Sequence, residues 1–204
     1  MKGVVAAGDK KSAQAGADIL KEGGNAYDAA VAVMLAAPMC EPLFTSLGGG
    51  GFLLGVEKNK APILYDFFVD VPMKRISEPE FFPIYVDFKT SIQEFHIGAG
   101  SIAIPGMVKG IYQIYEEKCT LPLSKLIEPA VKYAKEGVYL SAMQASFLKL
   151  TEPIFTSTKS STDVYTHNGK LVDETHLFKN PDYADFLENF AKEGSRLFYD
   201  GVVA

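Results

Sequence analysis

Four consecutive glycines, Gly48 to Gly51, are the first residues whose type and spacing could do chemistry. A phosphate-binding loop of this kind opens a helix and ends in Gly-Lys-Ser or Gly-Lys-Thr. Here Phe52-Leu53-Leu54 follows, which is typical of a strand, so the sequence argues against nucleotide binding. The glycines instead predict either a close approach of two backbones or bends with positive φ angles.

A carboxylate, Glu41, precedes this glycine run and lies beside Pro42 between two apolar segments. A carboxylate enclosed in this way either takes part in the chemistry of a site or accepts hydrogen bonds. Two interpretations follow. Glu41 is a buried carboxylate with a functional role, or it accepts hydrogen bonds from the backbone amides of the glycine turn.

The histidines and cysteines form no motif for catalysis or metal binding. His96, His167 and His176 are scattered and share no metal-ligand spacing, and no Gly-x-Ser-x-Gly motif occurs. Cys40 and Cys119 lie far apart, and Cys40 stands in an apolar run that predicts a small core residue. We therefore expect no disulfide framework, no metal site and no cofactor.

The bulk composition predicts a soluble, cytoplasmic chain. Its 204 residues suit one domain, or one and a half, and 48% of them are hydrophobic, which is enough for a substantial core. With a net charge of −5, nothing is basic enough to suggest nucleic acid as a partner. No segment approaches the roughly 18 apolar residues of a membrane span, and the apolar run at the N-terminus is too short for a signal peptide.

The element that must position the glycines is a predicted helix from Ala26 to Ala37. Asn25 is a good N-cap residue with Asp28 three residues on, and Pro38 should end the helix. Because the helix is apolar all round, it must be surrounded by other structure and is therefore central.

Other predicted elements cover this helix. The aromatic-rich stretch from Val69 to Phe95 shows no periodicity, which favours a long loop pinned by its rings, or a flap or pocket wall.

The chain ends on apolar Val202-Val203-Ala204 without a cap or polar tail, so we expect the protein to continue beyond Ala204. The remaining predicted strands lie at 3–7, 52–56, 63–68 and 101–104. The remaining predicted helices are one from about 10 to 22 capped by Asp9, four that begin at Pro105, Pro122, Pro129 and Pro181, and one capped by Ser141.

Several blocks of the sequence agree at once with one known family. They are Ala15-Gly16, ILKEGGNAYDAAVA (Ile19 to Ala32), Glu41-Pro42, GGGGF (Gly48 to Phe52), the hairpin AP…YDFF, Gly98 to Gly137 and Asn180 to Ala204. In order and with the expected intervals, these blocks cover almost the whole chain. They resemble the γ-glutamyltransferase family.

The resemblance implies an α+β fold, a four-layer αββα sandwich of the N-terminal-nucleophile hydrolase type, only partly contained in this chain. Residues 1–204 would form the N-terminal part of that domain. Within it, residues 1–68 would be a segment of the sandwich core, residues 69–97 an aromatic-rich loop, and residues 98–204 a mainly helical segment. The expected partner is the remainder of the precursor, or the small catalytic subunit.

The resemblance also implies acyl transfer from a γ-glutamyl or related amide, a small-molecule substrate, to water or an amine. In the family a precursor cuts itself before a threonine, whose new α-amino group serves as its own base. The processing run Thr-Thr-His does not occur here, and Thr166-His167 lacks the preceding threonine and the following apolar strand. Catalytic residues are therefore expected outside this chain, which alone should not catalyse the reaction.

One substrate contact of the family should fall inside this chain. In the family's pattern the second hairpin strand ends Asp-Gly-Arg-Glu-x-x-Pro, and the arginine holds the α-carboxylate of the γ-glutamyl group. In that register Phe68 stands at the arginine position, between Asp66 and Pro72. Losing a bidentate contact between arginine and carboxylate costs about 2–5 kcal/mol. The change favours a more apolar or differently charged acyl group, and Arg75 is a second candidate for substrate binding.

Two hypotheses about function remain. The chain is part of the large subunit of a γ-glutamyltransferase-related amidohydrolase or acyltransferase, or it is a truncated or degenerate relative that acts as a non-catalytic binding or structural protein. Phe68 at the arginine position and the absent threonine motivate the second hypothesis.

Overall fold

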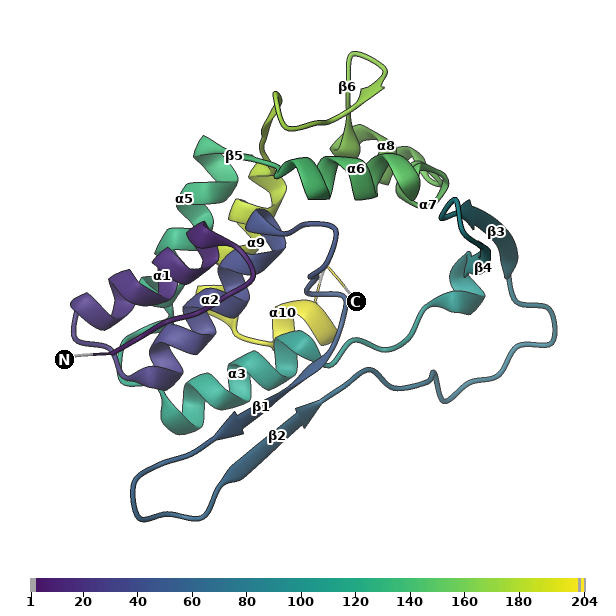
Figure 1. The fold of residues 1–204 in the computed structure, drawn as a ribbon. Helices are drawn as coiled ribbons and strands as arrows, with labels where there is room; N and C mark the ends of the chain where they lie inside the picture. Colours follow the sequence, from purple (N-terminus) through teal and green to yellow (C-terminus); the bar gives the residue numbers. More distant parts are fainter. Residues whose placement is uncertain (1–2, 202, 204) are drawn as a thin grey trace. The chain divides into compact units, whose positions relative to one another are not determined.

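The structure is a computed structural model that describes residues 3–201 and residue 203. It consists of helices and small two-stranded sheets, which confirms the predicted α+β class (Figure 1). The start of the N-terminal apolar run and the apolar chain end at Val202 and Ala204 lie outside the described residues. None of the described helices is both long enough and apolar enough to cross a lipid bilayer.

The chain divides into two compact units, so the helices predicted within residues 98–204 are shared between both. The first unit comprises Met1–Asp70, Pro105–Val138 and Lys179–Ala204, and the second comprises Val71–Ile104 and Tyr139–Phe178. The first unit contains α1 (Lys10–Lys21), α2 (Ala26–Cys40), β1 (Gly51–Gly55), β2 (Ile63–Phe67), α3 (Met107–Lys118), α4 (Leu123–Leu126), α5 (Glu128–Glu136), α9 (Pro181–Glu193) and α10 (Arg196–Tyr199). The second contains β3 (Phe82–Asp87), β4 (Ile92–Ile97), the short 3₁₀ helix η1 (Ala99–Ser101), α6 (Ala142–Leu150), α7 (Glu152–Phe155), α8 (Lys159–Tyr165), β6 (Thr166–His167), β7 (Lys170–Leu171) and β8 (Leu177–Phe178). The boundary between the two units in the sequence falls within β5 (Val138–Tyr139).

Helix α2 is the buried central helix that the sequence predicts. Asn25 and Asp28 form a reciprocal capping box, in which each side chain accepts a hydrogen bond from the backbone of the other. The prediction that Pro38 ends the helix is wrong, because α2 continues to Cys40. A proline in the last turn removes a single backbone hydrogen bond, and the burial of the surrounding apolar residues outweighs that loss.

The core of the first unit forms around α2. This helix contacts α1, α3, α4 and α5, and α9 packs on α5 (Figure 1). Burying one aliphatic or aromatic side chain of this size stabilises the fold by about 1.5–3 kcal/mol. The fully buried side chains of these helices include Ile19, Val31, Leu35, Met39, Ile111, Ile114, Leu126, Leu187 and Phe190.

Asp28 also ties the start of α2 to the segment that follows α3. Its buried carboxylate accepts hydrogen bonds from the Thr120 N–H at 2.9 Å, the Thr120 hydroxyl at 2.7 Å and the Leu121 N–H at 3.1 Å. Burial alone would raise the pKa of Asp28, but the hydrogen bonds from Thr120, Asn25 and Leu121 outweigh it and lower the pKa. The ionised carboxylate thus joins two segments that are distant in the sequence.

Strands β1 and β2 form an antiparallel hairpin with one buried face and one exposed face. Tyr65 and Phe67 point into the core of the first unit. The opposite, exposed face carries Asp66 but is otherwise apolar within the two strands, which is unusual because the solvated face of an antiparallel sheet normally carries polar residues. Its large apolar side chains are Phe52, Leu54, Leu64 and Phe68, which are between 58% and 64% exposed.

Three further sequence predictions differ from the structure. Residues 69–97 hold the hairpin of β3 and β4 where a loop is predicted, and its turn places Lys89 at a φ of 67°. The sequence has no Asn-Gly or Asp-Gly at this turn, so its local pattern does not predict the hairpin. The predicted strand at 101–104 is wrong because η1 occupies its first residue, and residues 3–7 are irregular rather than a strand.

Candidate functional site

The end of β2 is the region to which the sequence assigns substrate binding. Phe68 directly follows this strand and stacks on Phe52, with ring centroids 5.5 Å apart and an angle of 12° between the ring planes. The backbone N–H of Phe68 donates to Oδ1 of Asp66 at 3.0 Å, which fixes the turn out of the strand. The result is an exposed, uncharged aromatic pair that can pack against an apolar group.

Glycines allow two other segments to approach this strand end. A Cβ atom on Gly50 would lie 2.6 Å from the backbone nitrogen of Val69, and a Cβ atom on Gly106 would lie 2.2 Å from the carbonyl oxygen of Phe67. The glycines of the described chain that have positive φ do not include Gly48–Gly51. The predicted close approach of backbones is therefore confirmed, and the alternative of positive φ angles is wrong.

The start of α3 is fixed beside the glycine run. The carbonyl oxygen of Gly49 accepts hydrogen bonds from the N–H groups of Gly106 and Met107, both at 3.1 Å. The hydroxyl of Tyr199 donates to the carbonyl oxygen of Pro105 at 2.7 Å. The sequence does not predict this role of Tyr199, because the hydrogen bond joins α10 to a residue 94 positions earlier and no local pattern indicates such a contact.

Arg75, the second predicted substrate-binding residue, belongs to the second unit. It lies in the irregular segment that precedes β3, and its side chain is exposed. An exposed guanidinium can hold a carboxylate through two parallel hydrogen bonds. The assignment of substrate binding to Phe68 and Arg75 stays a prediction.

Glu41 lies at the C-terminal end of α2 and not at the glycine turn. A Cβ atom on Gly8 would touch its carboxylate, so the two are in direct contact. Burial and the nearby charge of Asp9 raise the pKa of Glu41, while a hydrogen bond from the backbone of Asp9 lowers it. The carboxylate therefore accepts a backbone hydrogen bond from the start of α1, and not from the glycine turn as predicted.

Neither of the two cysteines forms a disulfide bond. Cys40 is 2% exposed, which confirms that it is a small core residue. Burial raises the pKa of the Cys40 thiol to about 11 and that of the Cys119 thiol to about 12. Both groups are protonated near neutral pH and are poor nucleophiles.

Thr166 lies where α8 ends and β6 begins, and its hydroxyl donates to the carbonyl oxygen of Thr162 at 2.8 Å. Within residues 3–201 and 203, no group of three or more histidine, cysteine, aspartate and glutamate side chains is arranged for a metal ion.

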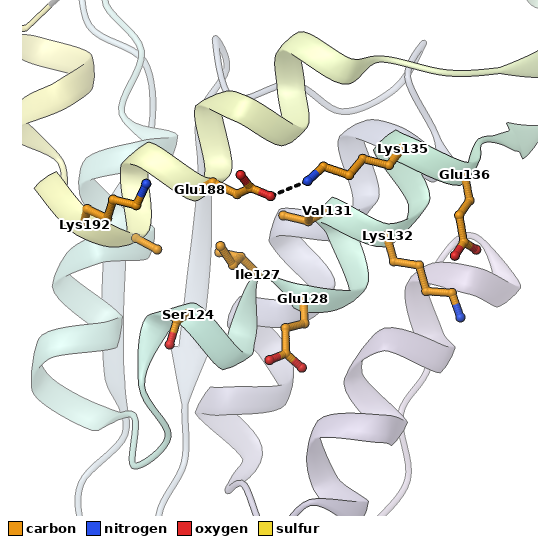
Figure 2. A pocket seen from close by; sticks show the side chains of 10 residues that line it. Ser124, Ile127, Glu128, Val131, Lys132, Lys135, Glu136, Glu188 and Lys192 are labelled. Atoms are coloured by element: carbon orange, nitrogen blue, oxygen red, sulfur yellow. Dashed lines mark hydrogen bonds and ion pairs between the residues drawn. The ribbon is translucent and has the colours of Figure 1, made fainter.

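A groove of about 530 Å³ lies between α4–α5 and α9 in the first unit (Figure 2). Ile127, Val131 and Ala191 line it, and an ion pair joins Lys135 to Glu188 across it. The hydrogen bond within this pair raises the pKa of Lys135 and lowers the pKa of Glu188. The polar and charged residues Ser124, Glu128, Lys132, Glu136 and Lys192 also line the groove.

Comparisons of sequence point to one family. The chain matches the family described as gamma-glutamyltranspeptidase over residues 12–204. It is 33% identical over 209 residues to the glutathione hydrolase proenzyme of Escherichia coli K12, and the alignment covers 99% of this chain and 34% of that protein. This chain spans about a third of the length of the curated relatives it matches.

Solved structures agree with the sequence match. The gamma-glutamyltranspeptidase of Helicobacter pylori superimposes with a TM-score of 0.85 at 30% identity, covering 100% of this chain and 58% of the other. A cephalosporin acylase of Bacillus halodurans gives a TM-score of 0.78 at 26% identity, covering 93% of this chain and 35% of the other. The fold is that of the N-terminal-nucleophile hydrolases, of which this chain contains a part.

Proposed function

This chain belongs to the gamma-glutamyltranspeptidase family, and from that premise we propose that it acts as the N-terminal part of the large subunit of an amidohydrolase or acyltransferase. It would supply one half of the catalytic sandwich and one wall of the acyl pocket. The nucleophile would be a threonine in the remainder of the protein, since the relatives are about three times as long.

The chemistry of such an enzyme is covalent catalysis by that threonine. Its hydroxyl attacks the amide carbonyl, and its α-amino group takes up the hydroxyl proton and passes it to the leaving amine. Water or an acceptor amine then attacks the resulting ester and releases the acyl group. In this scheme the residues of the present chain bind and orient the acyl group.

The observation that carries the proposal is the exposed apolar face of the β1–β2 hairpin. Phe52, Leu54 and Leu64 of this face are each more than half exposed. Large contiguous apolar patches on a protein surface mark interaction sites. The remainder of the protein would cover this face with a second sheet, and both layers would then form one sandwich.

The aromatic pair at the end of β2 supports an acyl group other than γ-glutamyl. Phe68 has no hydrogen-bond donor on its side chain, so it cannot hold an α-carboxylate as an arginine would. Its ring instead lies against Phe52, where an apolar or aromatic acyl chain could stack. The similarity to a cephalosporin acylase structure supports a range of acyl groups wider than γ-glutamyl.

The test is an assay of the full-length protein with γ-glutamyl-p-nitroanilide and a series of aliphatic and aromatic acyl p-nitroanilides. We expect turnover of the apolar amides to exceed that of the γ-glutamyl amide. Activity should disappear when the downstream N-terminal threonine is replaced by alanine. A preference for the γ-glutamyl amide would contradict the proposed substrate class but leave the proposed reaction intact.

The second candidate function is non-catalytic binding, in which a degenerate relative keeps only the fold. Phe68 at the arginine position is the observation that favours it. The same assay separates the candidates. If the full-length protein turns over no acyl amide and shows no self-cleavage on a gel, the non-catalytic candidate replaces the enzymatic one.

A further inference from the structure

Two of the three histidines, scattered in the sequence, lie together in the second unit. The rings of His167 and His176 have centroids 5.4 Å apart and planes inclined by 58°. Two imidazoles that bind one tetrahedral zinc ion have their centroids about 5 Å apart, because a zinc–nitrogen bond is about 2 Å long. The separation of the two rings therefore suits a shared metal ion.

A carboxylate orients one of these imidazoles. Nδ1 of His176 lies 2.9 Å from Oδ1 of Asp173. An ionised carboxylate only accepts hydrogen bonds, so Nδ1 carries the proton and Nε2 keeps its lone pair for a ligand. A carboxylate behind a histidine in this way is the usual partner of a metal-binding imidazole.

The local backbone holds all three side chains in place. The carboxylate of Asp173 also accepts hydrogen bonds from the N–H of Thr175 at 2.8 Å and from its hydroxyl at 2.6 Å. His167 ends strand β6 and pairs with Lys170 across a two-residue turn, whose Asn168 and Gly169 have φ angles of 52° and 73°. These φ angles are those of a tight hairpin turn, so the turn fixes the backbone at His167 without a ligand.

The two histidines are also accessible to ions from solution. The His167 side chain is exposed, and that of His176 is about one-third exposed. Imidazole nitrogen suits Zn²⁺, Ni²⁺ and Cu²⁺, whereas Mg²⁺ and Ca²⁺ prefer oxygen ligands. The described residues supply no third ligand, so water would complete the coordination.

From this geometry we propose that His167 and His176 form a binding site for a divalent transition-metal ion, with Asp173 as the residue that orients His176. The ion would join the β6–β7 hairpin to the segment that follows it. This site is independent of the acyl-transfer chemistry proposed above, since it involves none of the residues at the end of β2.

The test is isothermal titration calorimetry of the full-length protein with Zn²⁺ in a non-coordinating buffer, with Mg²⁺ as the hard-cation comparison. We expect Zn²⁺ to bind and Mg²⁺ to give no heat of binding at this site. His167→Ala and His176→Gln should each weaken Zn²⁺ binding by more than about tenfold, and Asp173→Asn by about tenfold, the range typical of second-layer partners of metal ligands.

His96→Ala is the matched control, because His96 lies in the same unit. It stacks on Phe81 at 4.0 Å and lies 3.2 Å from Glu94. Its replacement should leave Zn²⁺ affinity unchanged, and circular dichroism melts should show that all variants fold. Zn²⁺ binding that is equal in wild type, His167→Ala and His176→Gln would overturn the proposal, as would the absence of any Zn²⁺ binding.

Discussion

Phe68 is the residue on which the proposed preference for the acyl group mainly depends. Its ring is exposed and stacks on Phe52, and the sequence prediction places it where the family pattern has an arginine. A phenyl ring at this position offers apolar contact area and no charge. The acyl preference of the full-length protein should therefore depend on this side chain more than on any other in the chain.

The change Phe68→Arg tests this dependence. A guanidinium at the end of β2 can hold an α-carboxylate through two hydrogen bonds, so we expect kcat/KM for γ-glutamyl-p-nitroanilide to rise by about 10- to 100-fold relative to apolar amides. Steady-state kinetics of the full-length protein measures it. Phe52→Arg is the matched control, since Phe52 is equally exposed and belongs to the same aromatic pair. An equal gain in both variants would show that charge alone, and not position, is responsible.

Asp28 is the residue on which the attachment of α2 depends. Asp28→Ala would leave the N–H groups of Asn25, Thr120 and Leu121 without their acceptor, and we expect a loss of about 2–4 kcal/mol in the free energy of unfolding. Urea denaturation measures this loss. Asp18→Ala, which removes an exposed carboxylate that also lies on a helix, should cost less than about 1 kcal/mol.

The contribution of Asp28 should depend on pH in a defined direction. Its folded-state pKa is lowered, so the stability it provides is present above its unfolded-state pKa of about 3.9. That stability is lost as the pH falls through the lower, folded-state pKa. The difference in unfolding free energy between wild type and Asp28→Asn should therefore be constant near pH 7 and shrink below about pH 4. A difference that grows on acidification would contradict this assignment.

At the scale of elements, the contact between the glycine run, the end of β2 and the start of α3 positions the candidate site. Gly106 lies directly against the backbone of β2, and backbone atoms cannot move aside as a flexible side chain can. The hydroxyl of Tyr199 in α10 donates a hydrogen bond to the carbonyl oxygen of Pro105, the residue before Gly106. The direction in which Phe68 points thus depends on elements that are far apart in the sequence.

Gly106→Ala should disturb this contact. The added Cβ would lie 2.2 Å from the carbonyl oxygen of Phe67, and we expect a loss of about 1–3 kcal/mol in stability, as for other overpacked sites. Thermal unfolding measures it. Gly48→Ala is the control, because its Cβ would meet only the hydroxyl of Ser46 at 3.3 Å, and it should be near neutral. Equal effects of the two substitutions would mean that the backbone contact does not matter.

At the scale of the whole molecule, the apolar face of the β1–β2 hairpin is a surface that the described residues do not bury. Leu54 and Leu64 pair across the two strands and are both more than 60% exposed. An antiparallel hairpin whose two faces are both apolar is suited to lie between two layers. We expect the remainder of the protein to cover this face.

Chemical labelling tests this expectation. Leu64→Cys should react rapidly with a maleimide in the isolated 204-residue chain, and at least about tenfold more slowly in the full-length protein, where the thiol would be buried. Mass spectrometry follows the reaction. The native Cys40 and Cys119 should contribute little background, because burial raises the pKa of both thiols. Lys159→Cys, at an exposed position in the second unit, should react equally in both forms.

The sequence by itself determined the family, the α+β class and the main helices. Blocks such as the capping box at Asn25 and Asp28 are local, because a side chain and a backbone amide three residues apart can meet only in one way at a helix start. The absence of a polar face on α2 likewise predicted its burial. The same local reasoning failed at Pro38, where packing around the helix outweighed the loss of one hydrogen bond.

Only the tertiary structure decided which distant residues meet. It showed that the glycine run from Gly48 to Gly51 permits a close backbone contact and adopts no positive φ angles, that the hydroxyl of Tyr199 bonds to Pro105, and that the rings of His167 and His176 are neighbours. The physical reason is that such contacts arise from the burial of apolar surface over the whole unit, which is non-directional and leaves no local pattern in the sequence. The sequence names the residues, and the packing within each unit determines where they come together.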